Sequence, residues 1–317
     1  MGLLTLDIIG RIAAELAVEP REIYRIAISA SARYREILLH VPGKKERVVH
    51  QPSSELRLIQ RWCVDRLFHV LPVHESCFSY AKGRNIAMHA LAHAPNNYLS
   101  RIDIRQFFPS LERHNVVSLL SGHRNLLKIE TDREVEIVSS LVTRFGRLVI
   151  GAPSSPILSN ALMYEFDRKW WRFCNENKVT YTRYADDIYL STKVPNISSG
   201  ILKDLKGDLV GLPSFNFSIN TEKNIFTSRK RLRRVTGVVL TPGGRLSIGW
   251  TQKRKLKSLV YQALQHNLEG LEIQRILGML SHIDSVDPEF SRSLQRKYGV
   301  TYREQLKSLL GGERRAL

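Results

Sequence analysis

The segment with the most chemical content is 184–187, which reads Tyr-Ala-Asp-Asp and lies between two apolar, strand-like runs. The adjacent carboxylates of Asp186 and Asp187 repel each other, and burying either is costly unless a cation compensates. A third carboxylate, Asp103, lies at the end of another apolar run. Three carboxylates that meet at a hairpin turn could hold two divalent metal ions about 3.5–4 Å apart, the arrangement used for phosphoryl transfer. Oxygen-only ligands favour Mg²⁺ over zinc.

Each of these acids also has an ordinary structural explanation. An isolated Asp-Asp pair is usually a solvated turn, and Asp103 could simply cap the end of a strand. The residues that accompany the acids decide between the two interpretations.

Four further motifs occur with Tyr-Ala-Asp-Asp in a fixed order. Segment 102–110 reads Ile-Asp-Ile-Arg-Gln-Phe-Phe-Pro-Ser, and 151–156 reads Gly-Ala-Pro-Ser-Ser-Pro. After the acid pair come Ile-Asn-Thr-Glu-Lys at 219–223 and Val-Thr-Gly at 235–237. The ordered set resembles the palm motifs of reverse transcriptases, specifically those of the bacterial retron branch. The resemblance covers roughly residues 41–300.

The resemblance implies a role for each matching residue. Asp103 and Asp186 match the metal-binding aspartates and Asp187 the third carboxylate, so all three are the expected catalytic and metal-binding residues, with two Mg²⁺ ions. The expected nucleotide-binding residues are Arg47 assisted by Lys45 at the triphosphate, Phe108 as a steric gate against a ribose 2′-OH, the backbone at Gly151 and Ala152, and Lys223 as a candidate general acid near the pyrophosphate. The alternatives are a core aromatic for Phe108 and a solvated cation for Arg47.

The charge balance points to an anionic partner. The chain has 48 Lys and Arg against 30 Asp and Glu, a net charge of +18, which favours nucleic acid over an anionic membrane surface or no polyanion at all. Five of the six residues at 229–234 are cations. The resemblance to the retron branch and this basic run together give the expected RNA-binding residues, which are His93, Val235, Thr236, Gly237, Arg231, Arg233 and Arg234. A solvated basic face is the alternative for the cations.

The sequence departs from the family pattern at two positions. Ile150 stands where most reverse transcriptases carry Gln, which puts fidelity and processivity in doubt but not the chemistry. His89 replaces the Asn of the retron Asn-Ala-x-x-His motif, while Ala90 and His93 match. Two histidines four residues apart on a helix could bind zinc, but no acidic residue lies beside them, so a zinc site is disfavoured.

Composition and cysteine usage limit the class of protein. Hydrophobic residues are 43% and charged residues 25%, which is ordinary for a globular chain of roughly two domains. The chain has no uncharged apolar run of about 18 residues, which argues against a membrane-spanning helix. Three scattered cysteines and the lack of a basic N-terminal region before an apolar stretch predict a reducing, cytoplasmic location.

The elements that must position these residues mix helices and strands without a regular β-α-β alternation, so the expected class is α+β. Helices are expected at 3–16, 20–39, 53–71, 84–94, 110–120, 156–175 and from 251 onward. Strands are expected at 47–50 and 98–104, with hairpins at 180–191 and 235–250. The resemblance implies a right-hand polymerase fold: an N-terminal helical extension at 1–40, fingers at 41–98 with an inserted segment at 115–147, a palm at 99–114 and 148–245, and a basic helical thumb at 246–317.

The expected function is that of a stand-alone retron polymerase, because the length leaves no room for a ribonuclease H, endonuclease or maturation domain. Such enzymes use dNTPs to copy part of their own structured non-coding RNA, from an RNA 2′-OH, into a multicopy RNA–DNA hybrid. They generally act in antiphage defence with an effector protein. The alternatives are another bacterial reverse transcriptase, of a diversity-generating or phage-defence type, and a catalytically silent RNA-binding scaffold.

Overall fold

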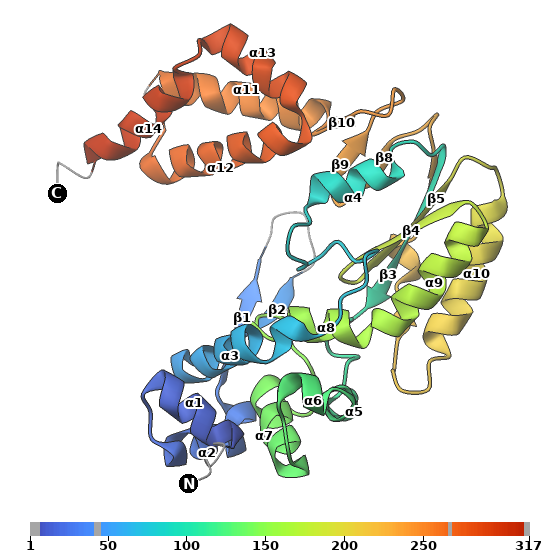
Figure 1. Ribbon diagram of the computed structural model, residues 1–317. Coiled ribbons are helices and arrows are strands. Elements are labelled where there is room, and N and C mark those ends of the chain that lie inside the picture. The colour runs from blue at the N-terminus through green and yellow to red at the C-terminus, as the bar shows by residue number, and fades with distance from the viewer. Residues whose placement is uncertain (1–6, 41–45, 266–267, 314–317) are drawn as a thin grey trace. The chain divides into compact units, whose positions relative to one another are not determined.

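The computed structural model describes residues 7–40, 46–265 and 268–313 (Figure 1). The chain divides into two compact units. Unit 1 comprises Met1–Gly83, Ser100–Leu190 and Asn196–Ile225, and unit 2 comprises Arg84–Leu99, Ser191–Pro195 and Phe226–Leu317. The finer division into extension, fingers, palm and thumb stays a prediction.

A five-stranded sheet carries most of the motifs. Its strands are β4 (Val179–Tyr184), β5 (Asp187–Thr192), β3 (Tyr98–Arg105) and β6 (Ser218–Ile219) in the order β4-β5-β3-β6, with β7 (Ile225–Ser228) also paired to β3. The apolar residues of β3 and β5 are buried, which explains why their sequences read as nearly continuous apolar runs. The helices α9 (Tyr164–Glu176) and α10 (Ile197–Val210) lie side by side (Figure 1), where Trp170 and Lys169 both donate hydrogen bonds to Asp208.

The remaining helices of unit 1 share one apolar core with this sheet. They are α1 (Ile8–Leu16), α2 (Pro20–Ile28), α3 (Ser54–Arg66), α5 (Arg113–Gly122), α6 (Arg124–Leu127), α7 (Asp132–Val142) and α8 (Ser155–Leu162). Ser53 caps α3 by accepting a hydrogen bond from the backbone N–H of Leu56, as expected of Ser at that position.

The predicted helix over 20–39 is wrong in its second half. The helix α2 ends at Ile28, and β1 (Tyr34–Leu39) pairs antiparallel with β2 (Arg47–Pro52), Tyr34 opposite Pro52 and Leu39 opposite Arg47. The residues of β1 pair with the next strand along the chain instead of continuing the helix. A helical spacing of apolar side chains does not reveal such a partner.

Two smaller expectations also need correction. The helix expected over 156–175 is broken at Met163 into α8 and α9, and the helix expected from Ser110 begins at Arg113 with Glu112 as its cap. Residues 148–150 form a loop in which the Leu148 N–H donates to the Leu111 carbonyl. The helices within 3–16, 53–71 and 84–94 and the hairpin at 180–191 are confirmed.

Unit 2 combines a small sheet with helices. The strands β8 (Arg233–Val235), β9 (Val238–Leu240) and β10 (Leu246–Ser247) pair in the order β10-β9-β8, and α4 (Ile86–His93) packs on them. The expected hairpin around 242–244 is confirmed as β9–β10, but Val235 belongs to a further strand because the chain already reverses at Thr236 and Gly237. Both have positive φ, 46° and 87°, as a two-residue hairpin turn requires.

The C-terminal region is helical, as predicted. The helices α11 (Trp250–Leu264), α12 (Gly270–Val286), α13 (Pro288–Tyr298) and α14 (Tyr302–Glu313) bury a core of their own. In the described residues, no helix is both long and apolar enough to span a lipid bilayer.

Candidate active site

The three predicted carboxylates come together on neighbouring strands of the five-stranded sheet. Asp103 lies in β3, Asp186 in the β4–β5 turn, and Asp187 is the first residue of β5. The two strands are held in register here by the Ile104 N–H, which donates to the Asp186 carbonyl at 2.9 Å. The acids, from segments far apart in the sequence, are thus close enough to affect one another electrostatically.

The site holds more negative charge than its surroundings favour. Burial and the neighbouring carboxylates of Asp186 and Asp103 raise the pKa of Asp187 to about 6, with Arg101 opposing the rise. Burial and Asp103 also raise the pKa of Asp186, opposed by the cations Lys223 and Arg47. A further cation near these acids would relieve both effects.

Two side chains supply part of that positive charge. Lys223 Nζ donates to both carboxylate oxygens of Asp103, at 3.0 and 3.1 Å. Arg101 Nε lies 3.7 Å from Asp187 Oδ1, close enough for attraction but not for a hydrogen bond. In the described chain, both of these buried atoms lack a hydrogen-bond partner.

Arg101 was not among the predicted site residues, although the sequence contains a signal for it. Alternate residues of a strand share a face, so a cation two positions before Asp103 in an otherwise apolar strand lies on the same side as that acid. Arg101 is therefore the member of the site that sequence reasoning missed.

The donor set fits a divalent cation in its chemistry. A buried carboxylate oxygen without a hydrogen bond, within a group of three acids, is the kind of ligand that hard cations prefer. Within the described ranges, no group of three or more His, Cys, Asp or Glu side chains is already placed to hold one ion. Lys223 and Arg101 pair with two of the acids instead, so metal binding would require those side chains to move.

The predicted nucleotide-binding residues occupy different environments. Arg47 is exposed on β2, and its charge acts on Asp186. Phe108 is half-buried, with its ring centroid 5.5 Å from that of Phe107. Ala152 is only 3% exposed, so it offers little surface to a ligand. Lys45 lies outside the described residues.

Gly151 is required by the packing of the protein's own backbone, and its closeness to the nucleotide and template stays a prediction. Its φ is 108°, and a Cβ there would lie 2.6 Å from the carbonyl oxygen of His50 and 2.7 Å from Val49 Cγ1. The His50 N–H also donates to the Ile150 carbonyl at 2.8 Å. The backbone that approaches Gly151 closely is thus the protein's own strand β2.

The predicted RNA-binding residues of unit 2 divide into buried and accessible groups. His93, Arg233 and Val235 are at most 1% exposed. The prediction that these three side chains contact RNA directly is therefore wrong for this structure. His93 Nδ1 lies 2.7 Å from Ser191 Oγ, and Arg233 donates to the carbonyls of Asn96 and Thr241. The hydrogen bonds of His93 and Arg233 therefore stabilise the structure of unit 2.

The accessible group contains the turn and its cations. Gly237, Arg231 and Arg234 are exposed and Thr236 is half-buried. Thr236 Oγ1 lies 3.4 Å from Nδ1 of His89, the residue that departs from the family pattern. His89 therefore contacts the Val-Thr-Gly turn directly.

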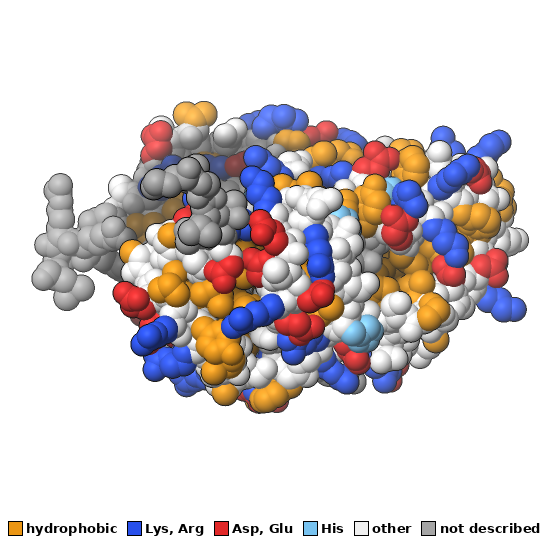
Figure 2. Space-filling model, turned by 60° about the horizontal axis from the view of Figure 1, so that its bottom comes forward, with side chains coloured by type: hydrophobic (Ala, Val, Ile, Leu, Met, Phe, Trp, Pro, Cys, Tyr) orange, Lys and Arg blue, Asp and Glu red, His pale blue; other side chains and the backbone are white. Residues whose placement is uncertain are grey.

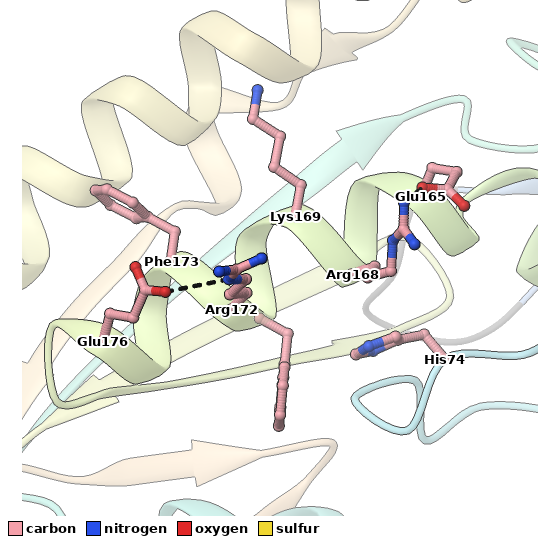
Figure 3. Close-up of a pocket in the computed structure, with 8 residues that line it drawn as sticks. His74, Glu165, Arg168, Lys169, Arg172, Phe173 and Glu176 are labelled. Carbon is pink, nitrogen blue, oxygen red and sulfur yellow. Dashed lines mark hydrogen bonds and ion pairs between the residues drawn. The ribbon is translucent and has the colours of Figure 1, made fainter.

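The surface recess on α9 is not the site of this chemistry. It has a volume of about 530 Å³ and is lined by α9 and His74 (Figure 3). Its arginines are already paired, Arg168 with Glu165 at 2.5 Å and Arg172 with Glu176 at 3.2 Å.

The excess positive charge is not gathered on the face shown in Figure 2. On that face, Lys and Arg side chains are spread among acidic and apolar side chains.

Comparisons with known proteins agree with this geometry. The family model described as reverse transcriptase (RNA-dependent DNA polymerase) matches residues 40–259. The retron Ec83 reverse transcriptase of Escherichia coli is 30% identical, covering 84% of this chain and 87% of that protein. The retron Ec73 and Ec86 reverse transcriptases of the same organism are 29% and 26% identical, covering 80% and 90% of this chain and 83% and 88% of theirs.

Solved structures show the same fold. The structure of apo telomerase from Candida tropicalis superposes with a TM-score of 0.51 at 12% identity, covering 90% of this chain and 62% of that one. The right-hand polymerase fold expected from the motifs is therefore confirmed. The chain belongs to the reverse transcriptase family and is an RNA-directed DNA polymerase of the bacterial retron type.

Proposed function

We propose that this enzyme copies part of a structured non-coding RNA into single-stranded multicopy DNA that stays joined to the RNA through the 2′-OH from which synthesis starts. It acts in the cytoplasm on dNTPs with two Mg²⁺ ions, and serves antiphage defence together with an effector protein. The observation that carries the polymerase chemistry is the meeting of Asp103, Asp186 and Asp187 on adjacent strands, with a buried Asp187 oxygen to which no described residue donates a hydrogen bond. The similarity to retron enzymes supports the choice of template.

Reverse transcriptases use divalent metal ions, and Asp103, Asp186 and Asp187 are the residues that would hold them. Bound there, such ions supply activation of the primer hydroxyl and charge neutralisation at the phosphates. The chain's own cations complete the site. Lys223 would leave Asp103 for the leaving pyrophosphate, and Arg47, whose charge already acts on Asp186, would bind the triphosphate.

Phe108 is proposed as the gate against ribonucleotides. Its ring is half-buried and held against Phe107, so it can fill a fixed volume beside the sugar. We expect Phe108→Ala to raise ribonucleotide incorporation relative to deoxynucleotide incorporation, measured by primer extension with each. Phe145→Ala, which removes a ring that is 71% exposed, serves as the control. An unchanged ratio in Phe108→Ala would leave Phe108 as a packing residue.

The linkage in the product tests the retron part of the proposal. The enzyme, expressed with its native locus, should copurify with a short DNA joined to RNA through a 2′,5′ bond, which debranching enzyme separates. An unbranched cDNA would instead indicate another bacterial reverse transcriptase. Failure to extend even an annealed primer would indicate an RNA-binding scaffold.

A further inference from the structure

Behind the catalytic turn lies a buried cation with a dedicated carboxylate. Arg183, in β4, and Asp167, in α9, both have side chains that are 0% exposed. Arg183 Nε and Nη2 donate to the two oxygens of Asp167 at 2.7–3.0 Å, and the Tyr181 hydroxyl donates to the same carboxylate at 2.8 Å. Burial alone would lower the pKa of Arg183, but Asp167 raises it above its ordinary value, so the guanidinium keeps its charge.

The same guanidinium also reaches the turn that carries the acids. Its third nitrogen, Nη1, lies 3.3 Å from the carbonyl oxygen of Ala185, directly before Asp186, and 3.3 Å from Asn160 Oδ1. On the other side, the Ala185 N–H donates to Ser79 Oγ at 2.8 Å. Both peptide groups of Ala185 are therefore held by buried side chains.

A second set of hydrogen bonds connects these holding groups. Asn160 Nδ2 donates to the Ser79 carbonyl at 2.8 Å. The backbone of Arg183 pairs with the same segment, since its N–H donates to the Ser76 carbonyl and its carbonyl accepts from the Phe78 N–H. Arg183, Asn160 and Ser79 thus form one network around the turn.

Ala185 needs this support because its backbone is strained. Its φ is 53°, a left-handed conformation that residues other than Gly, Asn and Asp seldom adopt. Such conformations persist where the surroundings determine them, and they cluster at functional sites. A turn released from the network would tend to relax and carry Asp186 and Asp187 away from Asp103.

We propose that Arg183, Asn160 and Ser79 are positioning residues that hold the Ala185–Asp186 turn so that its acids face Asp103. The assignment rests on the catalytic role proposed for those acids. It differs from a purely stabilising role because it predicts an effect on the use of metal, and not only on folding.

Ser79→Ala is the informative variant, since it deletes one small acceptor at the turn and leaves the buried ion pair intact. Its control is Tyr181→Phe, which deletes a hydroxyl that bonds to Asp167 and not to the turn. Both variants should lower the melting temperature slightly. Ser79→Ala should in addition lower kcat about tenfold or more and raise the Mg²⁺ concentration for half-maximal rate, with little change in KM for dNTP. Tyr181→Phe should keep both values near wild type.

Two results would overturn the proposal. One is a Ser79→Ala enzyme with wild-type kcat and Mg²⁺ requirement, and the other is a parallel decline of both variants that follows their melting temperatures. Asp186→Asn distinguishes this failure from failure of the site itself. If Asp186→Asn is inactive while Ser79→Ala is normal, only the positioning role is lost, whereas an active Asp186→Asn would remove the catalytic assignment.

Discussion

The β4–β5 hairpin, whose turn lies in unit 1, and the β8–β9 hairpin of unit 2 have similar turns but different charges around them. Each reverses direction at a residue other than glycine with a left-handed φ, Ala185 at 53° and Thr236 at 46°. Each also buries an arginine on the strand before the turn, Arg183 or Arg233. Arg183 meets the carboxylate of Asp167. Arg233 meets only backbone carbonyls and, among the described residues, no acid.

This difference in the partner of the buried arginine changes the charge balance of each hairpin. The pKa of Arg183 is raised by its partner acid, whereas burial and the nearby Arg229 lower the pKa of Arg233. Behind the β4–β5 turn, the buried charge of Arg183 is therefore neutralised by Asp167. The acids at the turn are not fully neutralised, so a bound cation would stabilise them. The β8–β9 hairpin carries positive charge inside and out, with exposed cations at Arg229, Lys230, Arg231 and Arg234. We therefore expect these exposed cations to bind the phosphate backbone of a nucleic acid.

Replacing each buried arginine by Met should separate the two cases most widely. Arg183→Met leaves Asp167 buried without its cation, which should cost about 3–5 kcal/mol of unfolding free energy. Arg233→Met removes a charge that has no acid, so the cost should be nearer to about 1 kcal/mol, from the two carbonyls that lose a donor. Urea titration of both variants measures the difference. Equal losses would mean that the paired acid does not distinguish the hairpins.

The histidines beside β8–β9 should give unit 2 its own pH dependence. Burial lowers the pKa of His89 to about 3, and burial with His89 and Arg233 nearby lowers that of His93. The unfolded chain binds protons at these histidines near a pH of about 6.5, and the folded chain does not. The contribution of the neutral histidines to the free energy of unfolding is therefore present above that pH and is lost as the pH falls. Asp187 has the opposite sign, because its pKa is raised to about 6 and its contribution is lost as the pH rises.

The matching substitution is His89→Asn, which places the usual residue of the retron motif at this position. Between about pH 7.5 and pH 5 it should lose about 2 kcal/mol less unfolding free energy than the wild type. Urea titrations at the two pH values measure this difference. If both proteins lose the same amount, the buried neutral state of His89 is not responsible.

The exposed cations of the second hairpin should contribute to RNA affinity with a salt dependence. Replacing Arg231 and Arg234 by Ala should weaken binding and reduce the slope of log affinity against log salt by about 0.7–0.9 for each phosphate that the protein no longer neutralises. Filter binding at several salt concentrations measures the slope. The control is Arg168→Ala with Arg172→Ala, because both cations already pair with acids on α9 (Figure 3). Equal slopes for the two double variants would place the β8–β9 cations outside the RNA-binding surface.

The sequence allowed the acids to be predicted, because their motif order is specific and their strands are apolar. It did not reveal β1, whose strand character depends on pairing with β2. Nor did it reveal which arginines are buried. Arg183 and Arg231 both lie in motif-rich stretches, and only the fold places one against Asp167 and the other at the surface. Gly151 was identified for close approach, but only the structure shows that the approaching group is the backbone of His50.

The most direct test of the central claim is primer extension on an RNA template with Mg²⁺, comparing wild type with Asp186→Asn. Asp204→Asn, which alters an exposed acid on α10, is the matched control and should extend like the wild type. Asp186→Asn should fall below about a thousandth of the wild-type rate while keeping its melting temperature and RNA affinity. Extension by Asp186→Asn within about tenfold of the wild type would contradict the assignment of the three acids as the catalytic site.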